Sequence, residues 1–116
     1  MTPILTLPQF DTGQYERSEF LMADGDAVLT IRVAELPDIQ IKFRRVRWHE
    51  FTALYNCNSE QIKAYFKVME IVPSHALDAY VANDKSARGA YRELHHYRIS
   101  LDETGCHEVY AESCVL

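Results

Sequence analysis

Five histidines and three cysteines are the residues of this 116-residue chain whose types could bind a metal ion or act as nucleophiles. The tightest group is His95, His96, Cys106 and His107, on two stretches that we expect to pair as a hairpin. Adjacent residues on a strand point to opposite faces, so His95 and His96 cannot bind the same ion, and the same holds for the Cys-His pair. Structural zinc requires four ligands. We therefore expect no metal site and no cofactor.

Nucleophilic catalysis needs a serine or cysteine close to a histidine that a carboxylate orients. The sequence contains none of the strings GxSxG, GxGxxG, GxxxxGK[ST] and HExxH. His49-Glu50 begins like the zinc-protease motif, but no second histidine follows at the required spacing. We expect a protein without catalytic activity. The alternative is a small hydrolase or nuclease that uses His95, His96 or His107.

The three cysteines, Cys57, Cys106 and Cys114, form an odd set without CxxC spacing. In an oxidising compartment one thiol would be left over. Met1 is followed by no basic segment of the kind that opens a secretory signal. We expect a cytoplasmic protein in which all three thiols stay free and fill the core as small apolar groups.

Net charge and the length of the apolar runs count against two classes of partner. The chain carries 17 acidic and 12 basic side chains, for a net charge of −5, which counts against a general nucleic-acid binder. No apolar run approaches the ~20 residues that span a bilayer, so we expect no membrane partner. Positions 42–47 are locally basic, and we interpret them as a solvated strand face. The acidic excess lies at the two ends of the chain, and Glu108, Tyr110 and Glu112 would share one face of the last strand.

Alternating apolar and polar residues predict that antiparallel strands form most of the fold. The alternation is clearest in Leu29, Ile31 and Val33. The expected non-helical elements are an edge strand at 4–7, a turn at 11–13, strands at 19–22 and 28–33 around the turn at Asp24-Gly25, a strand from 39 that bulges or breaks at Arg44-Arg45, a strand at 66–71, and a hairpin that joins 94–101 to 106–115 through a turn at 102–105.

Helices are fewer. Asn58-Ser59 predicts the start of a short helical turn at 59–64. Ser74 is expected to cap the one main helix, at about 74–84, which Asn83-Asp84 and Gly89 would end. Its inner face would carry Leu77, Tyr80 and Val81. The sequence therefore predicts a single α+β domain over 1–116, mostly antiparallel sheet, with one main helix and a C-terminal hairpin.

Three stretches carry a family resemblance: FRRVRWHEF at 43–51, KVMEIVPSHAL at 67–77 and HHYRISLDETGCHEV at 95–109. They are similar to a strand, to a strand leading into a serine-capped helix, and to the closing hairpin of small bacterial immunity proteins. These proteins belong to polymorphic toxin and contact-dependent inhibition systems. The resemblance extends over about 39–112.

The resemblance implies a cytoplasmic protein that neutralises a cognate toxin domain by tight binding. Many such toxins are basic nucleases, so an acidic partner would block them by steric occlusion and charge complementarity. On this interpretation the partner-binding residues, with nearby Tyr and Trp as anchors, are Asp102, Glu103, Glu108, Tyr110 and Glu112. A monomer or a homodimer is expected. A structural or adaptor domain that dimerises through an exposed sheet edge is a further alternative.

Overall fold

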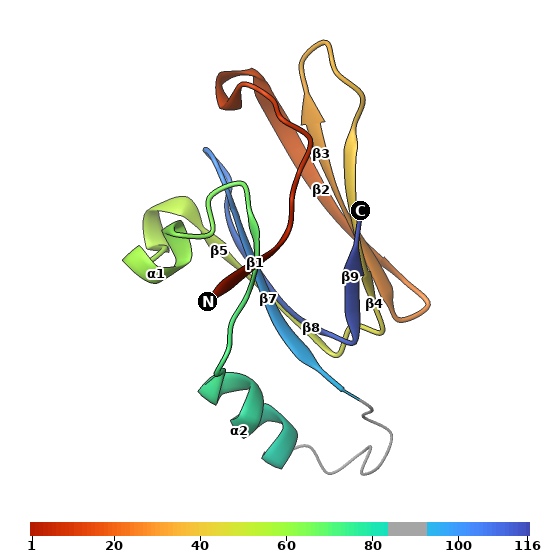
Figure 1. The fold of residues 1–116 in the computed structure, drawn as a ribbon, viewed down its shortest axis with the longest axis vertical. Helices are drawn as coiled ribbons and strands as arrows, with labels where there is room; N and C mark the ends of the chain where they lie inside the picture. Colours follow the sequence, from red (N-terminus) through yellow and green to blue (C-terminus); the bar gives the residue numbers. More distant parts are fainter. Residues whose placement is uncertain (84–92) are drawn as a thin grey trace.

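Two antiparallel sheets face each other in the computed structural model, which describes residues 1–83 and 93–116 (Figure 1). The strands are β1 (Thr2–Leu5), β2 (Tyr15–Ala23), β3 (Asp26–Val33), β4 (Ile39–Arg44), β5 (Trp48–Ala53), β6 (Val68–Glu70), β7 (His95–Leu101), β8 (Gly105–Ala111) and β9 (Ser113–Val115). The helices are α1 (Ser59–Ile62) and α2 (His75–Asn83), with short 3-10 turns η1 (Thr12–Gln14) and η2 (Leu54–Asn56). The five-stranded sheet has the order β1-β6-β7-β8-β5, and the four-stranded sheet has the order β2-β3-β4-β9.

The hydrophobic core lies between the two sheets and contains residues of both. The predicted alternation in β3 and β4 is confirmed, because every second residue of these strands is buried. The inward residues of β7 and β8 meet them from the other side. The largest fully buried side chains of this core are Phe43, Leu29, Ile31, Ile41, Ile99, Leu101, Val68 and Val109. The α+β class, with mostly antiparallel sheet and one main helix, is confirmed.

The chain passes between the sheets at Arg44-Arg45, where the sequence predicts a bulge or break. Arg45 has a positive φ of 50°, and its amide donates to the Asp26 carboxylate at 2.9 Å. The next residues lead into β5 of the five-stranded sheet, and the Arg47 amide donates to the Tyr110 carbonyl at 2.8 Å. The alternation of apolar and polar residues is therefore interrupted at this point because the chain moves from the four-stranded sheet to the five-stranded sheet.

A second crossover corrects the prediction of one strand at 106–115. The chain breaks at Glu112, whose amide donates to the Arg44 carbonyl at 2.9 Å. The last residues then form β9, which pairs with β4 in the four-stranded sheet. The two crossovers thus lie side by side, and the C-terminal hairpin consists of β7 and β8 alone.

Other expected boundaries are also wrong. The helical turn is confirmed but ends at Ile62, and Phe66 has a positive φ of 50°, so the following strand begins only at Val68. The first edge strand is Thr2–Leu5, which pairs with β6. The expected strand at 19–22 extends over Tyr15–Ala23, because β3 pairs along its length.

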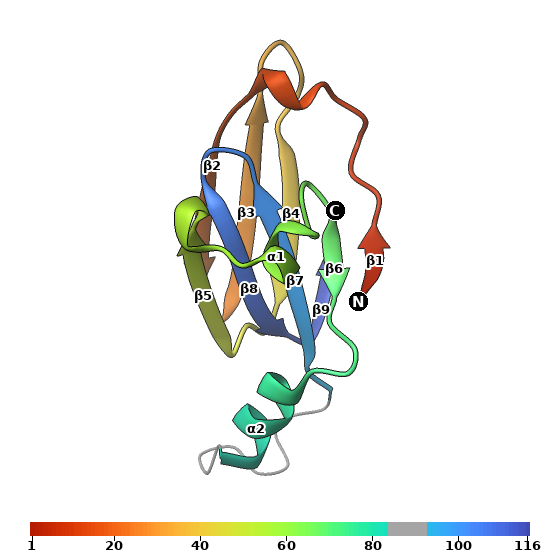
Figure 2. The ribbon, with the colours of Figure 1, turned by 90° about the vertical axis from the view of Figure 1, so that its left-hand side faces the viewer.

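Ser74 caps α2, as predicted, and its Oγ accepts the Leu77 amide at 3.1 Å. Leu77 and Tyr80 are half-buried, whereas Val81 is exposed, contrary to the expected inner face. The predicted helix end at Asp84 and Gly89 lies outside the described residues. Figure 2 shows α1 over the outer face of the five-stranded sheet and α2 beyond one end of it.

Within the described ranges, no helix has both the length and the apolar character needed to cross a membrane.

Candidate functional site

The outer face of the five-stranded sheet carries the richest group of polar and aromatic side chains. Outward residues of β7 and β8 are buried there, among them His96, Ser100 and Tyr110. The helices explain this burial, because α1 lies over this side of the sheet and α2 lies at its end (Figure 2). The hydroxyl of Ser100 donates to the carbonyl of Gln61, which attaches α1 to β7.

Glu108 on β8 is the centre of a hydrogen-bonded network on this face. Its side chain is 12% exposed. His96 lies 2.7 Å from its Oε1, Arg98 donates to the same oxygen at 2.9 Å, and Gln61 donates to Oε2 at 3.1 Å. Burial raises the pKa of Glu108, but the hydrogen bonds from His96 and Arg98 and the charge of Arg98 outweigh it and lower the pKa to about 2. Glu108 is therefore ionised and internally neutralised.

The network continues to α2 through His96, whose side chain is 5% exposed. Ser74 Oγ lies 2.7 Å from His96 Nδ1, while His96 Nε2 faces Glu108. Ser74, His96 and Glu108 thus form a continuous hydrogen-bonded chain from the helix cap to the middle of the sheet. One imidazole connects the start of α2 to two strands and fixes the position of the helix.

An aromatic groove lies between α2 and the ends of β5 and β8. The rings of Trp48 and Tyr110 stack with centroids 4.3 Å apart, and the ring of Tyr80 lies 5.2 Å from that of Tyr110. The Tyr80 hydroxyl donates to the Arg47 carbonyl at 3.1 Å, which holds α2 against the crossover. The groove has a volume of about 480 Å³ and is lined by Trp48, Ala76, Ala79, Tyr80, Asn83 and Tyr110.

Glu50 lies beside this groove. It is two residues from Trp48 on β5, so both side chains project from the same face. Glu50 is exposed, and its side chain has no hydrogen bond or ion pair with any residue in the described ranges. Burial, and then the charges of Glu108 and Glu50, raise the pKa of Tyr110. In the strand register the Glu50–Glu108 pair is the next pair on this face after Trp48–Tyr110, so Glu50 lies diagonally across from Tyr110 at the side of the groove.

The five sequence-predicted partner-binding residues are spread along the last hairpin and its end. Glu108 and Tyr110 share the outer face of β8, but Glu108 is in the buried network rather than on a solvated stripe. Asp102 and Glu103 lie in the turn at the opposite end of the hairpin. Glu112 lies at the crossover, 3.5 Å from Arg45.

The hairpin histidines lie in separate environments. His95 Nδ1 is 2.7 Å from Glu70 on the neighbouring strand, so His95 and His96 face opposite ways, as expected.

His107 hydrogen-bonds His49 at 3.0 Å, and Phe20 stacks on both rings. Burial, and then the charge of His49, lower the pKa of His107 to about 4. Among the described residues, no group of three or more His, Cys, Asp or Glu is arranged to hold a metal ion.

The three thiols are unpaired. Cys106 is buried on the outer face, and burial raises its pKa to about 11. Burial also raises the pKa of Cys114 to about 12. Both thiols therefore stay protonated and poorly nucleophilic near neutral pH.

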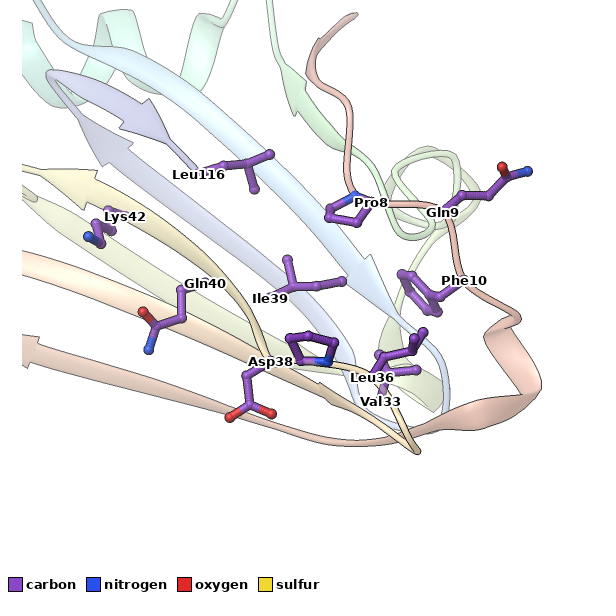
Figure 3. Close-up of a pocket in the computed structure, with 11 residues that line it drawn as sticks. Pro8, Gln9, Phe10, Val33, Leu36, Asp38, Ile39, Gln40, Lys42 and Leu116 are labelled. Atoms are coloured by element: carbon purple, nitrogen blue, oxygen red, sulfur yellow. The ribbon is translucent and has the colours of Figure 1, made fainter.

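A second hollow lies at the other edge of the molecule, between the N-terminal segment and β4 (Figure 3). Its volume is about 390 Å³. Phe10, Ile39 and Leu116 point toward it, whereas Asp38 and Gln40 point away. This hollow is apolar, and no sequence-predicted site residue lines it.

Comparison with protein-family models, with curated proteins and with solved structures finds no match for this chain. The site is therefore interpreted from its own geometry. The sequence does not reveal Ser74 as a partner of His96. It also does not identify Glu50 and Tyr80 as residues of a binding surface. The alternation of Trp48, Glu50 and Thr52 is the one local signal that places Glu50 on a strand face with the tryptophan.

Proposed function

We propose that this protein binds the toxin domain of a cognate bacterial toxin and neutralises it by occlusion, without catalysis. The contact surface is the outer face of the five-stranded sheet. The observation that carries the proposal is the aromatic groove beside Glu50. The half-buried rings of Trp48 and Tyr80 are suitable anchors for a basic protein partner, because they lie next to a carboxylate that is unpaired within the described residues.

The family resemblance supports the same face. The stretch 43–51 contributes Trp48 and Glu50, the stretch 67–77 contributes the start of α2, and the stretch 95–109 contributes His96 and Glu108. Segments far apart in the sequence thus meet around one surface. Their meeting is the expected arrangement if the resembling stretches serve one binding function.

Rigidity also supports binding. The buried charges of this face are already satisfied by one another, since Glu108 accepts hydrogen bonds from Arg98, Gln61 and His96. A preorganised surface loses little conformational entropy when a partner docks. The net charge of −5 adds an attractive field for a basic toxin domain.

Co-expression with the product of the gene immediately upstream tests this function. We expect the wild-type protein to restore growth and to co-purify with the toxin domain. Trp48→Ala should weaken both effects. Leu21→Ala is the matched control, because Leu21 is 65% exposed on the four-stranded sheet and should leave both effects unchanged. Absence of both a complex and growth rescue with the wild-type protein would contradict the proposal.

A second candidate function rests on the Ser74–His96–Glu108 chain, whose two links are each 2.7 Å long. In ester hydrolysis, Ser74 Oγ would bond to the carbonyl carbon while its proton passes to His96 Nδ1. That proton would then go to the leaving alkoxide oxygen, and water would repeat the sequence to release the acid. This function ranks second because Ser74 already accepts the Leu77 amide and Arg98 already neutralises Glu108.

Turnover of p-nitrophenyl acetate separates the two candidates. Hydrolysis that is lost in Ser74→Ala and in His96→Asn, but kept in His95→Asn, would favour the enzyme. No turnover above the uncatalysed rate would exclude it and leave the binding function.

A further inference from the structure

We propose that the aromatic groove binds the guanidinium group of an arginine side chain from the protein partner, with Glu50 as its counter-ion. This inference rests on the proposed function and names the chemistry of the group that the partner inserts. It is carried by the juxtaposition of Trp48, Tyr80 and Tyr110 with a carboxylate that has no cation of its own among the described residues.

The charges of β5 and β8 call for an external cation. Glu50 lies directly opposite Glu108 in the strand register. Directly opposed like charges are unfavourable on a sheet. Arg98 compensates Glu108, with its Nε at 2.9 Å and its terminal nitrogen at 2.8 Å from the same carboxylate oxygen. Glu50 has no equivalent partner in the part of the chain that the structure describes.

Nearby basic residues are engaged in other ways. The Arg45 side chain lies 3.5 Å from Glu112, and the backbone amide of Arg45 donates to the Asp26 carboxylate. The Arg47 backbone is fixed at both ends, because its amide donates to Tyr110 and its carbonyl accepts the Tyr80 hydroxyl. Within residues 1–83 and 93–116, no ion pair joins either arginine to Glu50.

The geometry of the rings favours a planar cation. Trp48 is within 25° of parallel to the buried Tyr110, whereas Tyr80 is inclined by 60° to Tyr110, so the two half-buried rings of the groove, Trp48 and Tyr80, present aromatic surfaces in two orientations. A guanidinium group can stack on one ring and still donate two hydrogen bonds to a carboxylate. Tryptophan is the aromatic side chain that attracts cations most strongly. Arginine therefore fits better than lysine, whose ammonium group cannot stack.

Trp48 makes this inference directly measurable, because it is the one tryptophan of the chain. Its fluorescence can be followed while the purified full-length protein is titrated with acetyl-Gly-Arg-Gly-amide. The neutral control probe is the same peptide with citrulline in place of arginine. We expect a saturable change with the arginine peptide, with a dissociation constant on the order of 1 mM for so small a ligand. The citrulline peptide should bind at least tenfold more weakly.

Variants locate the binding. Glu50→Gln should weaken arginine binding at least fivefold, and Tyr80→Ala should weaken it as well. Glu16→Gln removes the same charge from an exposed position on β2 and should change nothing. Far-UV circular dichroism establishes that each variant is folded. Equal binding of the arginine and citrulline peptides, or equal binding of the arginine peptide to wild type and Glu50→Gln, would overturn the inference.

The outcome is separate from that of the proposed function. Arginine binding that depends on Glu50, in a protein that forms no toxin complex, would support this inference and contradict the function. A toxin complex without arginine binding would support the proposed function and contradict this inference.

Discussion

Glu50 and Glu108 lie directly opposite each other on β5 and β8, but of the two only Glu108 has a cation among the described residues. Arg98 neutralises Glu108 from within the sheet and His96 lies within hydrogen-bonding distance of it, while Glu50 stays exposed beside the aromatic groove. Two carboxylates of the same face therefore have different roles. One fixes the structure of the face, and the other is available to a partner.

Neutralising Glu50 should make the free protein more stable. Glu50→Gln removes the repulsion from Glu108, and we expect the free energy of unfolding in urea to rise by roughly 0.2–1 kcal/mol. Glu16→Gln is the control and should give a smaller change, because Glu16 is exposed on the other sheet. A loss of stability in Glu50→Gln would mean that Glu50 has a stabilising partner, contrary to this account.

Neutralising Glu108 should have the opposite effect. Glu108→Gln leaves Arg98 without its counter-ion in a site where both side chains are largely buried, at 12% and 14% exposed. We expect a loss of roughly 3 kcal/mol in the free energy of unfolding. The double variant Glu108→Gln/Arg98→Met should recover part of this loss, because no unpaired charge remains. A single variant as stable as wild type would show that the network is not structural.

The free energy of unfolding should decrease over two separate pH ranges as the pH falls. The pKa of His107 is about 4 in the folded protein, against 6.5 for a histidine in an unfolded chain. The unfolded chain therefore takes up this proton first as the pH falls, and stability present above pH 6.5 is lost progressively down to pH 4, by up to about 3 kcal/mol.

Glu108 adds a second loss below pH 4.5, because its pKa is about 2 when folded. Urea unfolding between pH 7 and pH 3 checks both stages. His107→Gln should flatten the curve between pH 6.5 and 4 and leave the lower stage in place. A wild-type stability that stays constant from pH 7 to 4 would contradict the buried neutral His107.

Gly105 at the start of β8 should not tolerate a side chain. It has a positive φ of 146°, and an added Cβ would collide with the Thr52 carbonyl oxygen and lie 2.9 Å from the Phe51 ring. Gly105→Ala should destabilise the protein by more than about 3 kcal/mol, from backbone strain plus the collision. Gly25→Ala shares the positive φ but meets open space, so it should cost only about 1 kcal/mol. Similar losses in a thermal unfolding comparison would contradict this packing of β5 against β8.

The parts of the fold that sequence reasoning predicts are those set by local patterns. The alternation of Leu29, Ile31 and Val33 defines a strand without knowledge of its partners, and Ser74 marks the start of a helix by its capping chemistry. The change of sheet at Glu112 is not predictable in this way, because it depends on β4 being available as a neighbour. No local signal distinguishes Glu112 from a residue within a continuous strand.

The candidate site is predictable from the sequence only in part for the same reason. The alternation along β8 correctly places Glu108 and Tyr110 on one strand face, but their surroundings come from distant segments. Gln61 reaches Glu108 from 47 residues away in the sequence, and Ser74 reaches His96 from 22 residues away. The β5–β8 register that sets Glu50 opposite Glu108 is likewise a long-range property.

The affinity of the complex with the toxin domain tests the central claim most directly. Isothermal titration calorimetry should compare wild type with Glu50→Lys, and with Glu16→Lys as the control for net charge. The account predicts a tight wild-type complex, at least tenfold weaker binding by Glu50→Lys and nearly unchanged binding by Glu16→Lys. No binding by the wild-type protein, or equal binding by wild type and Glu50→Lys, would contradict it.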